Sequence, residues 1–150
     1  MAQVVAQTER LVAASPQRVR AFLVDYQNNR PRILPAEYFR DYRVEQGGDG
    51  AGTVISYRLR AGGRERAYRM RVEEPTEGGP ILEERDTGSS LVTSWTLSPV
   101  GEGEQTMVSL TSRWEGASGI GGFFERMFAP RALRRLYGEV LEKLSAELRV

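Results

Sequence analysis

Few side chains in this sequence could carry chemistry by themselves. Neither cysteine nor histidine occurs among the 150 residues. Their absence excludes disulfides, thiolate catalysis, Ser-His triads and most zinc sites. We therefore expect no metal and no cofactor, and carboxylates and tyrosines remain as the candidates for proton transfer.

Glu84 is the carboxylate that the sequence singles out as a candidate catalytic residue. In the segment PILEERD, Glu84 and Leu82 are two residues apart, so in a strand their side chains point to the same face. The side chains of Ile81, Glu83 and Arg85 would point to the other face. Each face of this strand therefore carries an acidic residue. A buried carboxylate needs a partner that compensates its charge. Two interpretations stay open: an edge strand or bulge with a solvated Glu84, or a pocket carboxylate that orients a ligand or acts as a general base.

A glycine-rich run, GASGIGGFFERMF, covers residues 116–128. It does not fit a phosphate loop, because no Lys-Ser/Thr pair follows and the GxGxxG spacing breaks at Phe124. One interpretation is a flexible lead-in that lets a helix pass close to a sheet. The other is a lead-in that gates the mouth of a pocket, with Phe123 and Phe124 covering the opening.

The elements that position these residues begin with a β-compatible stretch at 3–13. Ser15 is a good helix N-cap and Pro16 suits the first helical turn. Val19, Phe22 and Leu23 then follow at helical spacing, which predicts a short helix over 16–25. Prolines break residues 26–36, where another helical turn fits.

From residue 38 to residue 114 the apolar period is two. Alternating segments place one apolar face against one charged face, which is typical of antiparallel strands with one wet side. Gly62-Gly63 predicts a hairpin turn, and the segments PILEERD, LVTSWTLSP and TMVSLTSRW predict three further strands. This pattern indicates about six strands in succession.

Helical spacing returns at the C-terminus. Apolar residues recur there at i, i+3, i+4 and i+7, and Pro130 either kinks this helix or restarts it. Strands followed by one long helix predict an α+β fold with an antiparallel sheet. The stripe consists of Phe124, Met127, Phe128, Leu133, Leu136, Tyr137, Val140, Leu141, Leu144 and Leu148.

Three stretches carry a resemblance to a known superfamily: Val12–Pro16, Arg71–Pro75, and Trp95–Pro99 followed by a glycine turn and Thr106-Met107-Val108. Their order and spacing resemble the START/Bet v 1-like (SRPBCC) superfamily, especially its bacterial polyketide cyclase/dehydrase and lipid-transport-like members. The resemblance covers essentially the whole chain, which we take as one domain, residues 1–150. One departure is that Leu82 is followed by two glutamates where the family often has an aromatic residue.

The resemblance implies a helix-grip fold, in which a curved antiparallel sheet of about seven strands wraps a long C-terminal helix. One or two short helices follow the first strand. One helix cannot fill the concave side of such a sheet, so a hydrophobic cavity is expected unless large side chains fill it. Its expected ligand-binding residues are Tyr57, Leu59, Tyr68, Met70, Leu82, Glu84, Trp95, Leu97, Leu110, Phe124, Phe128 and Tyr137. For the aromatic members, the alternative is that they only fill the core.

The charge balance limits the kinds of partner. The net charge is +1, so we expect no nucleic-acid partner, and the arginines at 58, 60, 69 and 71 are expected to pair with glutamates across strands. The arginines at 131, 134 and 135 are expected to face solvent, with contact to an acidic partner left open. No apolar run approaches the roughly 20 residues that cross a bilayer, and no signal-peptide pattern is visible. We expect a cytoplasmic protein without stable membrane insertion, and a homodimer is compatible with the sequence.

Three functional hypotheses follow. The first is a binding or carrier protein for a small hydrophobic molecule such as a lipid, isoprenoid, polyketide or aromatic compound. The second is a polyketide cyclase or dehydratase in which Tyr and Glu84 move protons in the same pocket. The third is a protein whose own side chains fill the pocket and which acts through protein partners.

Overall fold

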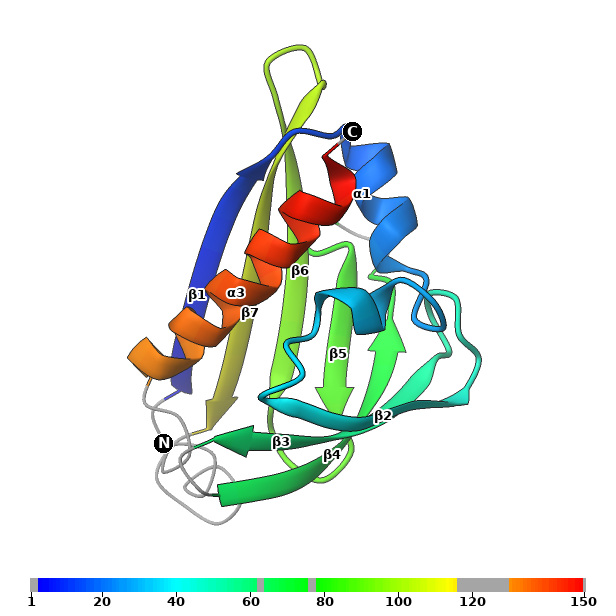
Figure 1. Ribbon diagram of the computed structural model, residues 1–150, viewed down its shortest axis with the longest axis vertical. Coiled ribbons are helices and arrows are strands. Elements are labelled where there is room, and N and C mark those ends of the chain that lie inside the picture. Colours follow the sequence, from blue (N-terminus) through cyan, green and yellow to red (C-terminus); the bar gives the residue numbers. More distant parts are fainter. Residues whose placement is uncertain (1–2, 62–63, 76–77, 116–129, 150) are drawn as a thin grey trace.

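The computed structural model describes residues 3–61, 64–75, 78–115 and 130–149, which form one sheet and the helices packed on it (Figure 1). The elements in chain order are β1 (Gln3–Val12), α1 (Pro16–Leu23), the 3-10 helix η1 (Arg30–Ile33), β2 (Phe39–Gln46), β3 (Val54–Ala61), β4 (Arg64–Glu73), β5 (Leu82–Asp86), β6 (Val92–Val100), β7 (Gln105–Glu115) and α3 (Pro130–Leu148).

The sheet has seven strands in the order β1-β7-β6-β5-β4-β3-β2, and every neighbouring pair is antiparallel. Strands β2 to β7 therefore form a continuous meander, and β1 joins it at β7. This arrangement, with α3 lying across the sheet beside β1 and β7 in Figure 1, confirms the predicted α+β helix-grip fold.

The first helix forms where its capping residues predict it. The Ser15 side chain accepts a hydrogen bond from the backbone N–H of Arg18 at 3.3 Å, and Pro16 takes the first helical position. The helix ends at Leu23, two residues earlier than expected, because the Asp25 carboxylate accepts hydrogen bonds from the next backbone N–H groups and fixes a turn there. The proline-broken connection contains η1, the second short helix.

Helix α3 buries the apolar stripe that the sequence predicted. Its side chains at 133, 136, 140, 141 and 144 are buried in one cluster with the inner face of the sheet. Within the described residues α3 runs from Pro130 to Leu148, and the residues that would distinguish a kink from a restart at Pro130 lie outside them. The predicted stripe residues Phe124, Met127 and Phe128, and the glycine-rich run, lie outside the described residues.

The outer face of the sheet is charged and paired. Arg58 bonds to Glu65 at 2.7 Å and Arg69 bonds to Glu45 at 2.8 Å, which confirms the predicted pairing of these two arginines with glutamates. Within the described ranges, no helix is long and apolar enough to cross a membrane.

Candidate functional site

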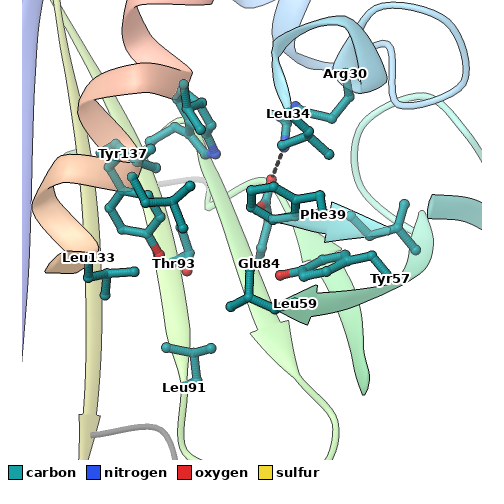
Figure 2. Close-up of a pocket in the computed structure, with 15 residues that line it drawn as sticks. Arg30, Leu34, Phe39, Tyr57, Leu59, Glu84, Leu91, Thr93, Leu133 and Tyr137 are labelled. Carbon is teal, nitrogen blue, oxygen red and sulfur yellow. Dashed lines mark hydrogen bonds and ion pairs between the residues drawn. The ribbon is translucent and has the colours of Figure 1, made fainter. Parts of the chain in front are cut away.

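A cavity lies between α3 and the inner face of the sheet (Figure 2). Its volume is about 50 Å³. Most of its wall is apolar, and a few polar side chains interrupt it. The residues lining it are Arg30, Leu34, Phe39, Ile55, Tyr57, Leu59, Glu84, Leu91, Thr93, Trp95, Leu110, Leu133, Leu136, Tyr137 and Val140.

The structure separates the candidate residues into three groups. Those that line the cavity are Tyr57, Leu59, Glu84, Trp95, Leu110 and Tyr137. Those that lie elsewhere are Tyr68, Met70 and Leu82, which are buried, and Leu97, which is half-buried. Phe124 and Phe128 lie outside the described residues.

Strand parity accounts for this division only in part. Tyr57 and Tyr68 are opposite each other in the β3–β4 register and their rings stack at 5.8 Å. Both therefore face inward, but only Tyr57 reaches the cavity, and Tyr68 packs behind it. Parity identifies the inner face of a strand, whereas the empty space depends on how the sheet and α3 meet.

Glu84 belongs to a buried ion pair. Its Oε2 accepts a hydrogen bond from Arg30 Nη1 at 2.5 Å and another from the Tyr26 hydroxyl at 2.5 Å. The Arg30 side chain is 3% exposed and the Glu84 side chain 9% exposed. The interpretation of Glu84 as a solvated residue at an edge or bulge is therefore wrong, because β5 is an inner strand and Arg30 supplies the compensating charge.

Arg30 is the functional candidate that sequence reasoning missed. It lies in η1, and its Nη2 donates to the Leu23 carbonyl at 2.8 Å. The guanidinium also lies over two rings, 4.2 Å from the centre of Tyr26 and 4.9 Å from that of Trp95. The available signal was indirect: an inward glutamate requires a cation, and a short helical turn in the proline-broken connection carries two arginines.

Tyr26 is held as a donor toward Glu84. Burial raises the pKa of Tyr26 well above its ordinary value, and Arg30 only partly opposes this. Tyr26 itself is anchored through its carbonyl, which accepts a hydrogen bond from the Tyr42 hydroxyl at 2.7 Å. The Glu84 carboxylate of the ion pair therefore accepts a hydrogen bond from a hydroxyl whose position is fixed.

A chain of hydroxyls forms a second polar group, on the α3 side of the cavity. The Tyr137 hydroxyl bonds to Ser112 Oγ, which bonds to Thr93 Oγ1 at 2.6 Å. Figure 2 shows the Tyr137 hydroxyl beside Thr93 and, across the cavity, the Tyr57 hydroxyl pointing inward. Burial raises the pKa of both tyrosines, so their hydroxyls stay protonated.

Two buried donors at the ion-pair end lack an acceptor in the described part of the chain. They are Trp95 Nε1 and Arg30 Nε. Trp95 is 2% exposed and Arg30 2% exposed. Buried N–H groups without an acceptor are uncommon in folded proteins because they lose their hydrogen bonds to water.

The cavity is small for a ligand site. A cavity of about 150 Å³ holds benzene, and pockets for drug-sized ligands span about 300–1,000 Å³. A ligand is therefore compact, or it displaces lining side chains. Among the lining residues Leu34, Phe39 and Tyr57 are only half-buried, so the described wall is least covered near the end of η1 and the start of β2.

The fold and this inner cavity define a START/Bet v 1-like (SRPBCC) protein. A family described as "Polyketide cyclase / dehydrase and lipid transport" matches residues 3–149, and the chain belongs to this family. A search among curated proteins found no match.

Solved structures agree with this assignment. The NMR structure of the KanY protein is 42% identical, covers 98% of both chains and has a TM-score of 0.82. The protein TTHA0849 from Thermus thermophilus is 20% identical over 95% of both chains, with a TM-score of 0.73. A Thalictrum norcoclaurine synthase point mutant, in complex with a transition state analogue, is 13% identical over 97% of this chain and 94% of that chain, with a TM-score of 0.70. The last two likenesses show the fold alone.

Proposed function

We propose that this protein binds a small hydrophobic molecule in the cavity between the sheet and α3. The observation that carries the proposal is a mostly apolar cavity with a buried Arg30–Glu84 pair in its wall. Apolar walls gain roughly 25 cal/mol per Å² of surface removed from water. The ion pair and the hydroxyls of Tyr57 and Tyr137 would fix the orientation of the ligand.

The comparisons support this proposal at the level of the family. The family description names polyketides and lipid transport, both of which involve largely apolar molecules. The norcoclaurine synthase structure holds a transition state analogue on the same fold. The third hypothesis, a protein acting through protein partners, has less support, since the large hydrophobic residues exposed in the described part of the chain are Val5 and Leu11, on one strand.

A thermal-shift screen tests the proposal. The panel holds quinones, sterols, flavonoids, fatty acids and aromatic polyketides. A ligand at about 100 times its Kd adds about 2.7 kcal/mol, which raises Tm by about 5–10 °C in a domain of this size. A panel without any shift, extended to single-ring compounds, which require the smallest displacement of the cavity wall, would refute the proposal.

A matched pair of variants shows whether the ligand occupies this cavity. Leu133→Phe adds volume to the cavity wall, and Leu148→Phe makes the same change on the same helix outside the lining. Leu133→Phe should reduce the ligand-induced rise in Tm, measured against its own unliganded protein, while Leu148→Phe should retain it. Equal shifts in both variants would place the ligand elsewhere.

A cyclase or dehydratase activity is the second candidate, favoured by the carboxylate of Glu84 in the cavity wall. Its Oε2 is already bonded to Arg30 and Tyr26, which leaves Oε1 to take a proton. Glu84→Gln keeps the shape and removes the base, so it should abolish turnover of a poly-β-keto substrate if the protein is an enzyme. If the protein is a carrier, the same variant changes ligand affinity and, because Arg30 loses its counter-charge, stability, but there is no turnover to lose.

A further inference from the structure

We propose that the ligand of this cavity is a neutral molecule that presents a hydrogen-bond-accepting oxygen, such as a ketone, to Arg30 and Trp95, and that the cavity rejects carboxylates. This inference rests on the proposed binding function and adds the chemical class of the ligand. It follows from two features of the ion-pair end of the cavity.

The first feature is the charge of the wall. Among the described lining residues, Arg30 and Glu84 are the charged side chains, and they pair with each other at 2.5 Å. A carboxylate ligand would have to leave water without a free counter-charge, and Glu84 would repel it. An ammonium ligand would have to displace Arg30 from Glu84. A neutral ligand meets neither penalty.

The second feature is the pair of unused donors. Trp95 Nε1 and Arg30 Nε are buried, lack an acceptor in the described part of the chain, and belong to side chains that line this cavity. The Arg30 guanidinium lies over the Trp95 ring, with its carbon 4.9 Å from the ring centre. Both donors therefore belong to the same end of the cavity. An oxygen acceptor on the ligand would satisfy a donor that otherwise has none.

The remaining wall suits an apolar body. In Figure 2 the side chains of Leu59, Leu91 and Leu133 lie away from Arg30, on the other side of Glu84. A ligand with its oxygen at the Arg30 end would place its hydrocarbon part against these leucines. The volume of about 50 Å³ is below the roughly 150 Å³ that holds benzene, so even a single ring would have to displace lining side chains, and larger bodies would displace more.

Three probes of similar shape test the inference: acetophenone, its apolar counterpart cumene, and benzoate. The chain has 2 tryptophans, so a ¹⁵N-labelled sample gives two indole N–H signals, which Trp95→Phe assigns. Trp114, which is buried outside the lining, serves as the internal reference. Acetophenone should move the Trp95 signal downfield and leave that of Trp114 in place, whereas cumene should bind without the downfield shift. Benzoate should bind at least about tenfold more weakly than acetophenone.

Two variants separate the donor from the charge. Trp95→Phe should weaken acetophenone about 2–10-fold relative to cumene, because one hydrogen bond is lost. Glu84→Gln should improve benzoate binding at least about tenfold, because the Arg30 charge becomes available to it. Glu83→Gln is the matched control: it removes the neighbouring charge, which pairs with Arg85 and Arg113 outside the cavity lining, and should leave benzoate binding unchanged.

The outcomes distinguish this inference from the binding function itself. If cumene and acetophenone both bind but the Trp95 signal does not respond to the ketone, the cavity binds ligands and the inference is wrong. Tightest binding of benzoate to the unaltered protein would also overturn it. If none of the three probes binds and the wider panel is silent as well, the binding function fails together with the inference.

Discussion

Removing either charge of the Arg30–Glu84 pair would leave the other charge buried without its counter-charge. Arg30→Met leaves the Glu84 carboxylate buried without a positive charge beside it. Glu84→Leu leaves the Arg30 guanidinium, whose side chain is 3% exposed, without a negative charge beside it. Breaking a buried pair in this way costs about 3–5 kcal/mol. In a domain of this size each single variant should therefore lose about 6–20 °C in Tm.

The double variant is expected to cost far less than the sum of the two single variants. With both charges gone, the remaining cost comes from the Tyr26 hydroxyl and the Leu23 carbonyl, which lose their partners at about 1–3 kcal/mol each. Arg30→Met loses the bond to the Leu23 carbonyl and Glu84→Leu loses the bond from Tyr26, so the sum of the single losses exceeds the double loss by the cost of the unpaired charges. From the midpoints of these ranges we expect a coupling energy of about 4 kcal/mol.

Urea unfolding followed by circular dichroism measures all three variants against the unaltered protein. The control is the exposed pair of Arg69 and Glu45, joined at 2.8 Å but with side chains 56% and 32% exposed. The same cycle there should give no more than about 1 kcal/mol of coupling. Additive losses at Arg30 and Glu84, or single losses under about 1 kcal/mol, would refute the argument that this pair is desolvated.

Three further predictions concern the tyrosines, the α1 cap and the hydroxyl chain. Burial raises the pKa of all six tyrosines, that of Tyr68 to about 12. The folded chain therefore holds these protons more tightly than the unfolded chain, and the free energy of unfolding should fall as pH rises from about 10 to 12. Absorbance at 295 nm should show tyrosinate appearing together with the loss of ellipticity; titration near pH 10 in the folded protein would contradict this. Ser15→Ala should cost about 1 kcal/mol in urea unfolding, and Ser15→Thr much less, because only alanine removes the cap. Ser112→Ala leaves Tyr137 and Thr93 without their shared partner and should cost about 1–3 kcal/mol, against nearly nothing for the exposed Ser98→Ala.

Much of the fold could be predicted because its determinants are local. The inner side of an antiparallel sheet contacts the core and the outer side contacts water. Apolar and polar residues therefore alternate along each strand. The start of α1 was equally local, since Ser15 and Pro16 act within one turn. The end of α1 could not be predicted in the same way. The Asp25 carboxylate accepts hydrogen bonds from the backbone N–H groups of Gln27 and Asn28, and such a turn produces no periodic pattern in the sequence.

The candidate site could be predicted only in outline. The alternation of side chains left two orientations open for Glu84, and whether a carboxylate remains inside depends on a cation supplied 54 residues earlier in the chain. Periodicity carries no information about such a pair. Met70 and Leu82 have the same inward parity as the residues of the cavity wall and yet lie outside it, because the position of α3 decides where space is left.

The position of β1 in the sheet has a consequence for how the chain folds. Strands β2 to β7 can pair in succession as hairpins, but β1 pairs with β7 across almost the whole chain, with Gln3 opposite Glu115. Closing a loop of about 100 residues rather than about 10 costs roughly 2 kcal/mol more in chain entropy. Because this pairing closes the longest loop in the sheet, we expect β1 to find its partner last. Until it does, β7 presents a row of unpaired backbone groups, and this edge is where a second chain would add and aggregation would begin.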